Sequence, residues 1–102
     1  IKNIIPKGAT IYMPIESTQW LIQLLKNYYD LRTLQGRKIP SFEAYKNAYR
    51  EDFLRPDEIK QEKDDSYYLI GTVFTDYYYS FEYIFGNENP ILINSQYAIK
   101  KL

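Results

Sequence analysis

Cysteine and histidine are both absent from this chain of 102 residues. Without cysteine there can be no disulfide and no thiol nucleophile, and the redox compartment stays unassigned. Without histidine the chain lacks the Ser-His and Cys-His nucleophile pairs, the usual zinc ligand sets and the most common general base. These absences remove most enzyme classes, so we expect a protein that has no catalytic activity and binds no cofactor.

Long apolar segments are missing as well. No stretch of the sequence approaches the roughly 18 to 20 apolar residues of a membrane helix, and no basic stretch leads into an apolar one as in a signal peptide. The sequence therefore predicts a soluble protein with no membrane partner; its localisation stays unassigned, and the interior of the cell is the favoured compartment.

Tyrosine is the residue in excess. The chain has 12 Tyr against 5 Phe and 1 Trp, within a hydrophobic fraction of 45%. That fraction is enough for one modest core, so we expect residues 1–102 to form a single compact domain. A buried Tyr hydroxyl needs a hydrogen-bond partner, so the tyrosines should be ordered within the core or lie at its edge.

Charge is balanced overall but unevenly distributed. Residues 1–55 contain nine Lys or Arg and five Asp or Glu, a net charge of +4, whereas residues 56–102 contain four and eight, a net charge of −4. The two halves should attract each other or another copy of the chain. Ile, Lys, Asn and Tyr supply 40 of the 102 residues, a bias typical of AT-rich coding sequence and so of a low-GC microbe, a virus or a mobile element.

The first third of the chain predicts a strand and then a helix. Residues 9–13 alternate weakly and are followed by Pro14, which indicates a short edge strand. Residues 18–35 carry apolar side chains at helical spacing, and Gly36 is well placed to end this helix. The side chains that we expect to pack on the sheet are Trp20, Leu24 and Tyr28.

Two further helices are expected before the next strands. Ser41 is a good N-cap for a helix with an aromatic stripe, and Pro56 ends that helix. The stripe consists of Phe42, Tyr45, Tyr49 and Phe53. Because Pro56 is followed by two acids, it is also a good helix opening, so a third, short helix is predicted over residues 56–63.

Tyr45 and Tyr49 resemble, in their spacing alone, the paired tyrosine nucleophiles of some rolling-circle replication initiators and relaxases. Those enzymes hold their metal with a histidine pair, and this chain has no histidine. The same spacing is the ordinary period of an amphipathic helix. We therefore assign both tyrosines to the core.

Three strands are predicted over residues 67–74, 77–85 and 91–99, which are dense in aromatic or β-branched residues. The middle segment has an aromatic residue at every second position, which would place five rings on one face of a strand. These rings are Tyr77, Tyr79, Phe81, Tyr83 and Phe85. The predicted fold is α+β, with a short N-terminal strand and two to three helices packed on a three-stranded antiparallel β-meander.

Carboxylates are the remaining candidates for catalysis or metal binding. Asp57 and Glu58 belong to a run of acids between residues 51 and 65. The run lacks the glycine-punctuated spacing of a calcium loop, and its acids lie among Lys and Arg. A solvated surface is the better interpretation, so no metal site is predicted.

The favoured function is a non-enzymatic protein-interaction module, of the kind that small viral or mobile-element proteins supply. Its contact surface would consist of tyrosines that the helices cannot cover, namely Tyr67, Tyr68, Tyr77 and Tyr78. The partner would be another protein or a second copy of the chain. A two-fold homodimer would bring the basic half of one copy onto the acidic half of the other.

The alternative is binding of single-stranded nucleic acid, in which cations follow the phosphates and rings stack on bases. The basic residues that would do this are Arg37, Lys38, Arg50 and Arg55. The zero net charge of the chain argues against this alternative. No motif in the sequence indicates a small-molecule substrate.

Overall fold

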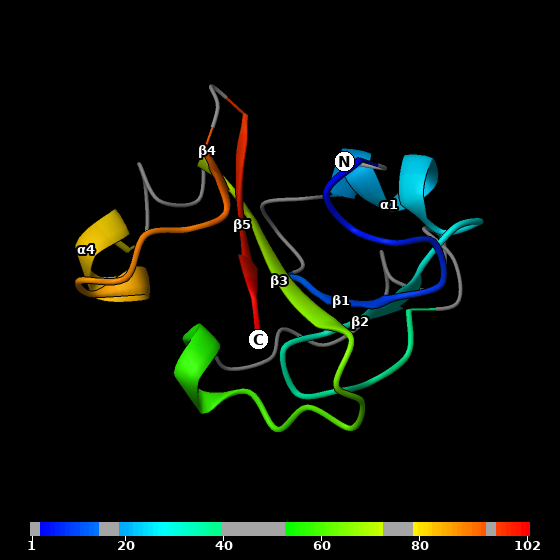
Figure 1. The fold of residues 1–102 in the computed structure, drawn as a ribbon, viewed down its shortest axis with the longest axis horizontal. Coiled ribbons are helices and arrows are strands. Elements are labelled where there is room, and N and C mark those ends of the chain that lie inside the picture. Colours follow the sequence, from blue (N-terminus) through cyan, green and yellow to red (C-terminus); the bar gives the residue numbers. More distant parts are fainter. Residues whose placement is uncertain (1–2, 15–18, 40–52, 73–78, 94–95) are drawn as a thin grey trace.

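The structure, a computed structural model, describes residues 3–14, 19–39, 53–72, 79–93 and 96–102. Figure 1 shows these segments arranged around one twisted sheet. In chain order the elements are β1 (Thr10–Tyr12), α1 (Gln19–Leu25), β2 (Asp30–Arg32), the 3-10 helix η1 (Pro56–Glu58), β3 (Ser66–Gly71), α4 (Phe81–Phe85), β4 (Leu92–Ile93) and β5 (Tyr97–Lys101).

Within the described residues, the sheet has five strands in the order β2-β1-β3-β5-β4 and is mixed. Strand β1 pairs in parallel with both β2 and β3, whereas β5 pairs antiparallel with both β3 and β4. Because parallel neighbours need a crossover connection, α1 lies between β1 and β2 in the chain. The α+β class is confirmed, but the predicted three-stranded antiparallel meander is wrong.

Both faces of the sheet are covered, and a separate apolar cluster fills each side. Ile11 and Leu69 pack with residues of α1 in one cluster, and Tyr12 and Tyr68 pack with residues of α4 in the other. Neighbouring residues of a strand point to opposite faces, which explains how adjacent side chains enter different clusters. In Figure 1, α1 and α4 accordingly lie on opposite sides of β3 and β5.

The first predicted strand is present, but it is not at the edge. Strand β1 lies between β2 and β3, and all three of its residues are buried. The edge position belongs to β2, part of whose outer side is covered by the next chain segment through a bridge between Arg32 and Lys38. Pro14 follows β1 without disturbing it because the proline lies beyond the paired residues.

Helix α1 is shorter than the predicted helix and faces the sheet differently. It ends at Leu25, and residues 30–32 of the predicted helix form β2. Leu21, Ile22 and Leu25 are buried, whereas Leu24 is 60% exposed and Tyr28 is 37% exposed, so their predicted packing on the sheet is wrong. The side chain of Trp20 is not among those described. Gly36 adopts a φ of 90° in the turn after β2 and does not end the helix.

The predicted aromatic strand over residues 77–85 is wrong in its described part, which forms helix α4. The Ser80 side chain caps this helix by accepting a hydrogen bond from the Tyr83 amide at 3.1 Å. Helical spacing brings the rings of Phe81 and Phe85 to 4.8 Å, and Phe85 is buried. Gly86 ends the helix at a φ of 59°, which side-chain-bearing residues rarely adopt.

Two other segments differ from the sequence-based expectation. The predicted strand over residues 91–99 is a pair of antiparallel strands, since Leu92 lies opposite Ile99 in the register of β4 and β5. The predicted third helix begins at Pro56 as expected but ends at Glu58 as a single 3-10 turn. Most of the predicted second helix, including Tyr45 and Tyr49, lies outside the described residues.

Candidate interaction surfaces

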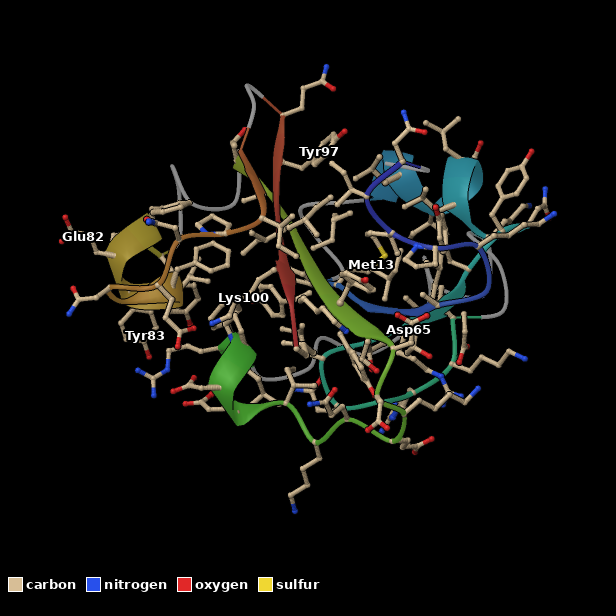
Figure 2. The ribbon with its side chains drawn as sticks, in the orientation of Figure 1. Met13, Asp65, Glu82, Tyr83, Tyr97 and Lys100 are labelled. Atoms are coloured by element: carbon tan, nitrogen blue, oxygen red, sulfur yellow. The ribbon has the colours of Figure 1, made fainter. Side chains whose placement is uncertain are left out.

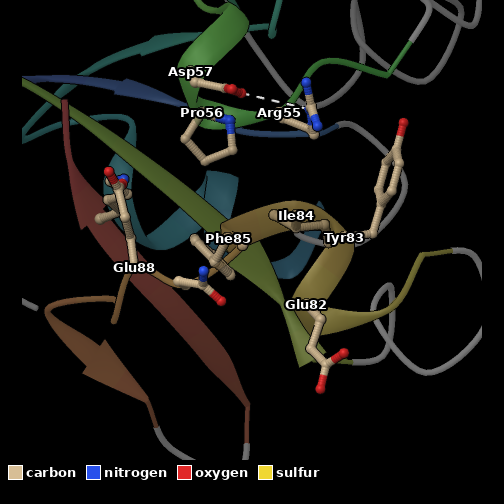
Figure 3. Close-up of a pocket in the computed structure, with 11 residues that line it drawn as sticks. Arg55, Pro56, Asp57, Glu82, Tyr83, Ile84, Phe85 and Glu88 are labelled. Atoms are coloured by element: carbon tan, nitrogen blue, oxygen red, sulfur yellow. Dashed lines mark ion pairs between the residues drawn. The ribbon is translucent and has the colours of Figure 1, made fainter.

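A hollow of about 390 Å³ lies where η1, α4 and β5 meet. We call it the α4 hollow; its lining residues are Arg55, Pro56, Asp57, Glu82, Tyr83, Ile84, Phe85, Gly86, Asn87, Glu88 and Lys100. Figure 3 shows Arg55 and Asp57 above α4, with Tyr83 extending from the helix on the same side as Arg55. Glu82 extends from the opposite side of the helix.

Aromatic rings form a stack beside this hollow. The ring centroids of Phe53 and Tyr79 are 4.4 Å apart with an interplanar angle of 20°, and those of Tyr79 and Tyr83 are 5.3 Å apart at 17°. The Arg55 guanidinium carbon lies 5.5 Å from the Tyr83 ring centroid, within the range of a cation–π contact. Tyr79 is 36% exposed and Tyr83 is 52% exposed, so the stack is accessible from solvent.

Two carboxylates hold Arg55 in place. Its Nη2 atom lies 3.2 Å from Oε1 of Glu58, and its Nε atom lies 3.5 Å from Oδ1 of Asp57. The Arg55 amide also donates a hydrogen bond to Oε2 of Glu58 at 3.1 Å. Because these contacts come from one short turn, the guanidinium is oriented before any partner arrives.

Acids outnumber cations around the α4 hollow. Among the lining residues, Asp57, Glu82 and Glu88 stand against Arg55 and Lys100, a net charge of −1, and Glu58, which pairs with Arg55 beside the hollow, makes it −2. Lys100 forms an ion pair with Glu88. Glu82, by contrast, has no ion-pair partner among the residues that the structure describes.

A second hollow, of about 470 Å³, lies beside β2 and is basic. We call it the lysine hollow; its lining residues are Lys26, Asn27, Tyr28, Tyr29, Asp30, Arg32, Lys38 and Lys63. Four cations and one carboxylate give it a net charge of +3. The exposed Tyr28 ring extends this surface, and Nζ of Lys7 lies 5.8 Å from its centroid.

The cations of the lysine hollow differ in how they are held. Arg32 is fixed, with Nε 3.1 Å from Oδ1 of Asp30 and Nη1 donating to the Gly36 carbonyl at 3.0 Å. The hydrogen bond to Asp30 raises the pKa of Arg32. Lys26, Lys38 and Lys63 form no ion pair with any other residue in the described part of the chain.

The tyrosines predicted to form a contact surface are not exposed where they are described. Tyr67 and Tyr68 belong to the central strand β3 and are buried, so their expected exposure is wrong. The reason is that the sheet is covered on both faces, and Nζ of Lys101 also lies 5.2 Å from the Tyr67 ring centroid. Tyr77 and Tyr78 lie outside the described residues.

The basic residues of the nucleic-acid alternative do not form one patch. Lys38 lines the lysine hollow and the exposed Arg37 precedes it, whereas Arg55 lines the α4 hollow. Arg50 lies outside the described residues.

Sequence reasoning missed Tyr83 as a surface residue and left Tyr79 out of the predicted contact surface because it placed both in a strand. A signal for the helix was present, since Ser80 and Gly86 bracket five residues as an N-cap and a C-terminal stop would. Glu82 in the first turn of α4 agrees with the same reading.

Asp57 and Glu58 serve as ion-pair partners of Arg55. In the described ranges, no group of three or more acidic side chains is placed to hold a metal ion. No helix in those ranges has the length and apolar character needed to cross a membrane.

Comparison with known proteins assigns no relative. No protein-family model matches this chain, and no match was found among curated proteins or among solved structures.

Proposed function

We propose that this chain is a non-enzymatic protein-interaction module that binds its partner at the α4 hollow and the adjoining aromatic stack. The observation that carries this proposal is the solvent-accessible stack of Tyr79 and Tyr83 with Arg55 fixed beside it. Tyr and Arg are enriched among the residues that dominate binding energy at protein interfaces. Their positions are held by packing and ion pairs, which lowers the entropy lost on binding.

The chemistry of the hollow favours a basic protein segment as the ligand. The exposed edges of the stacked rings can pack against the methylene groups of a Lys or Arg side chain, and the net negative charge around the hollow adds a long-range attraction. Glu82 offers a carboxylate that no described cation already neutralises. One basic side chain of a partner could therefore pack its methylene groups along the exposed edge of Tyr83, and a second could pair with Glu82 on the opposite side of the helix.

Fluorescence anisotropy with a labelled, lysine- and arginine-rich peptide tests this proposal, with an acidic peptide of equal length for comparison. We expect binding of the basic peptide only, weakened by Tyr83→Ala and by Glu82→Lys and reduced at high salt. Asp64→Lys is the matched control, because Asp64 is exposed and does not line the hollow. Equal binding by the control and by Glu82→Lys would contradict the proposed site.

Binding of single-stranded nucleic acid is a second candidate function. The observation that favours it is the group of Lys26, Lys38 and Lys63, which form no ion pair with any described residue, beside the exposed Tyr28 ring. Such a surface could track phosphates and stack a base. A titration with labelled oligonucleotides at two salt concentrations tests it, with Lys38→Glu as the variant that should lose binding.

A further inference from the structure

We propose that the lysine hollow of one copy of this chain binds the α4 hollow of the next copy, so that the protein associates head to tail. This inference rests on the proposed function, because it names a second copy as the partner of the α4 hollow.

Complementary charge is the first support. The lysine hollow carries a net charge of +3, and the α4 hollow with Glu58 carries −2. Charges on both sides are unsatisfied in one copy: Lys26, Lys38 and Lys63 on one surface and Glu82 on the other lack ion pairs to any described residue. Three like charges around one hollow repel one another, and an acidic surface placed among them relieves that repulsion.

The shapes of the two surfaces are also suited to each other. Helix α4 lies at the outer margin of the molecule, and Figure 2 shows Glu82 and Tyr83 pointing outward from it. The lysine hollow is a broad depression of about 470 Å³ beside β2. Helix α4 could enter it, with one lysine ammonium group at the Glu82 carboxylate and the methylene groups of another lysine along the exposed edge of the Tyr83 ring.

Apolar side chains add area on both sides. Tyr28 is exposed and lines the lysine hollow, and Tyr83 is exposed and lines the α4 hollow, with the exposed Tyr79 stacked beside it. An interface core of this kind, rimmed by opposite charges, is typical of specific protein contacts.

The position of the two surfaces decides the symmetry. The lysine hollow borders β2, at one edge of the sheet, whereas α4 lies on the far side of β3 and β5 (Figure 1). One copy therefore cannot satisfy both surfaces by itself. A contact between two different surfaces is heterologous, so each added copy leaves one surface of each kind free until a ring closes.

The test uses two double variants that each block one surface. Lys38→Glu with Lys63→Glu blocks the lysine hollow, and Glu82→Lys with Tyr83→Ala blocks the α4 hollow. Sedimentation velocity at rising protein concentration should show the wild type forming species larger than a dimer, more weakly at high salt. Each double variant alone should remain monomeric, with association weakened about tenfold or more. An equimolar mixture should form a one-to-one heterodimer and nothing larger, because each variant keeps one working surface.

Circular dichroism must show that both double variants fold. If the lysine-hollow variant does not fold, Lys38→Gln with Lys63→Gln replaces it, and if the α4-hollow variant does not fold, Glu82→Gln replaces it. A wild type that stays monomeric at high micromolar concentration but still binds the basic peptide overturns the head-to-tail contact and leaves the proposed function standing. A wild type that stays monomeric and does not bind the basic peptide overturns both the head-to-tail contact and the proposed function. Three other results would also overturn the inference. The wild type could stop at a dimer, or the mixture of variants could fail to associate. The wild type could also be a monomer with salt-sensitive oligonucleotide binding that Lys38→Glu abolishes.

Discussion

The hydroxyl of Tyr68 donates a hydrogen bond to the main-chain carbonyl oxygen of Leu54 at 3.1 Å, from a side chain that is fully buried. This contact ties the central strand to the segment that leads into η1 and Arg55. Tyr29 makes a similar bond to the carbonyl oxygen of Ile5 at 2.8 Å. The excess of tyrosine thus has a structural use, because rings fill the core while hydroxyls secure irregular segments at its margin.

Tyr68→Phe should destabilise the fold by about 1–2 kcal/mol, because it removes the hydrogen bond and leaves the carbonyl of the half-buried Leu54 without that donor. Urea denaturation followed by circular dichroism measures the change. Tyr83→Phe is the matched control, since the Tyr83 ring is half-exposed and its stack does not need the hydroxyl. Equal effects of the two variants would mean that the Tyr68 hydroxyl contributes nothing to stability.

Tyr68 should also make stability fall at alkaline pH. Burial raises the pKa of Tyr68, and the charge of Glu58 raises it further. Below about pH 10, the ordinary value for Tyr, the hydroxyl is protonated in both the folded and unfolded states and stabilisation is complete. Above that pH the unfolded chain loses the proton while the folded chain retains it, so the free energy of unfolding decreases.

Urea midpoints measured from neutral to strongly alkaline pH should therefore decrease less steeply for Tyr68→Phe than for the wild type. Some dependence should remain in the variant, because burial also raises the pKa of Tyr29. Parallel curves for the two proteins would contradict the assignment to Tyr68.

Strands β1 and β3 could be predicted from the sequence, but β2, the division between β4 and β5 and the pairing of the strands could not. Residues 67–74 were recognised as a strand because of their aromatic and β-branched content, and β3 begins at Ser66. All six residues of β3 are buried, which occurs when helices cover both faces of a sheet. No periodicity within the segment distinguishes that environment from one buried face, so Tyr67 and Tyr68 were wrongly expected at the surface.

Helix α4 was missed because two periodicities compete in the same residues. Phe81, Tyr83 and Phe85 alternate as in a strand, yet Phe81 and Phe85 are also one helical turn apart. The helix is favoured because the Ser80 side chain caps its N-terminus and Gly86 ends it. The wrong strand assignment also gave the wrong environment for Tyr79 and Tyr83. In a strand, both rings would lie on the same face as Phe85, which is buried in the structure.

The two hollows were beyond sequence reasoning for another reason. Lys26, Lys38 and Lys63 are distant in sequence and meet only because β2 lies beside β1 and β1 beside β3. The sequence shows only that the first half of the chain is basic and the second half acidic. It does not show which charged side chains lie together on the surface of the fold.

Two neighbouring residues of α1 should respond differently to truncation. Ile22 is fully buried, so Ile22→Ala should cost about 2–5 kcal/mol as a core truncation. Leu24 is mostly exposed, so Leu24→Ala should change stability by less than about 0.5 kcal/mol. Urea denaturation of both variants tests the orientation of the helix, and a larger loss for Leu24→Ala than for Ile22→Ala would reverse it.

We predict no metal-dependent nuclease activity, because Asp57 and Glu58 are engaged by Arg55. Incubation of the protein with labelled single-stranded oligonucleotide and Mg²⁺ should leave the oligonucleotide intact, and EDTA should not change the melting temperature. Asp64→Ala serves as the control for any contaminating activity. Cleavage that needs Mg²⁺ and disappears in Asp57→Ala but not in Asp64→Ala would refute the prediction.

The two ends of α4 should each contribute measurably to stability, because this short helix buries Ile84 and Phe85 against the sheet. Ser80→Ala removes the bond to the Tyr83 amide and should cost about 1 kcal/mol. Gly86→Ala should cost about 1–3 kcal/mol through backbone strain alone, since an added Cβ would meet no atom within 4 Å and the loss must come from the positive φ. Asn87→Ala, at the exposed next position, is the control and should change stability by less than about 0.5 kcal/mol. Urea denaturation compares the three, and a Gly86→Ala variant as stable as the control would show that α4 does not end at a strained glycine.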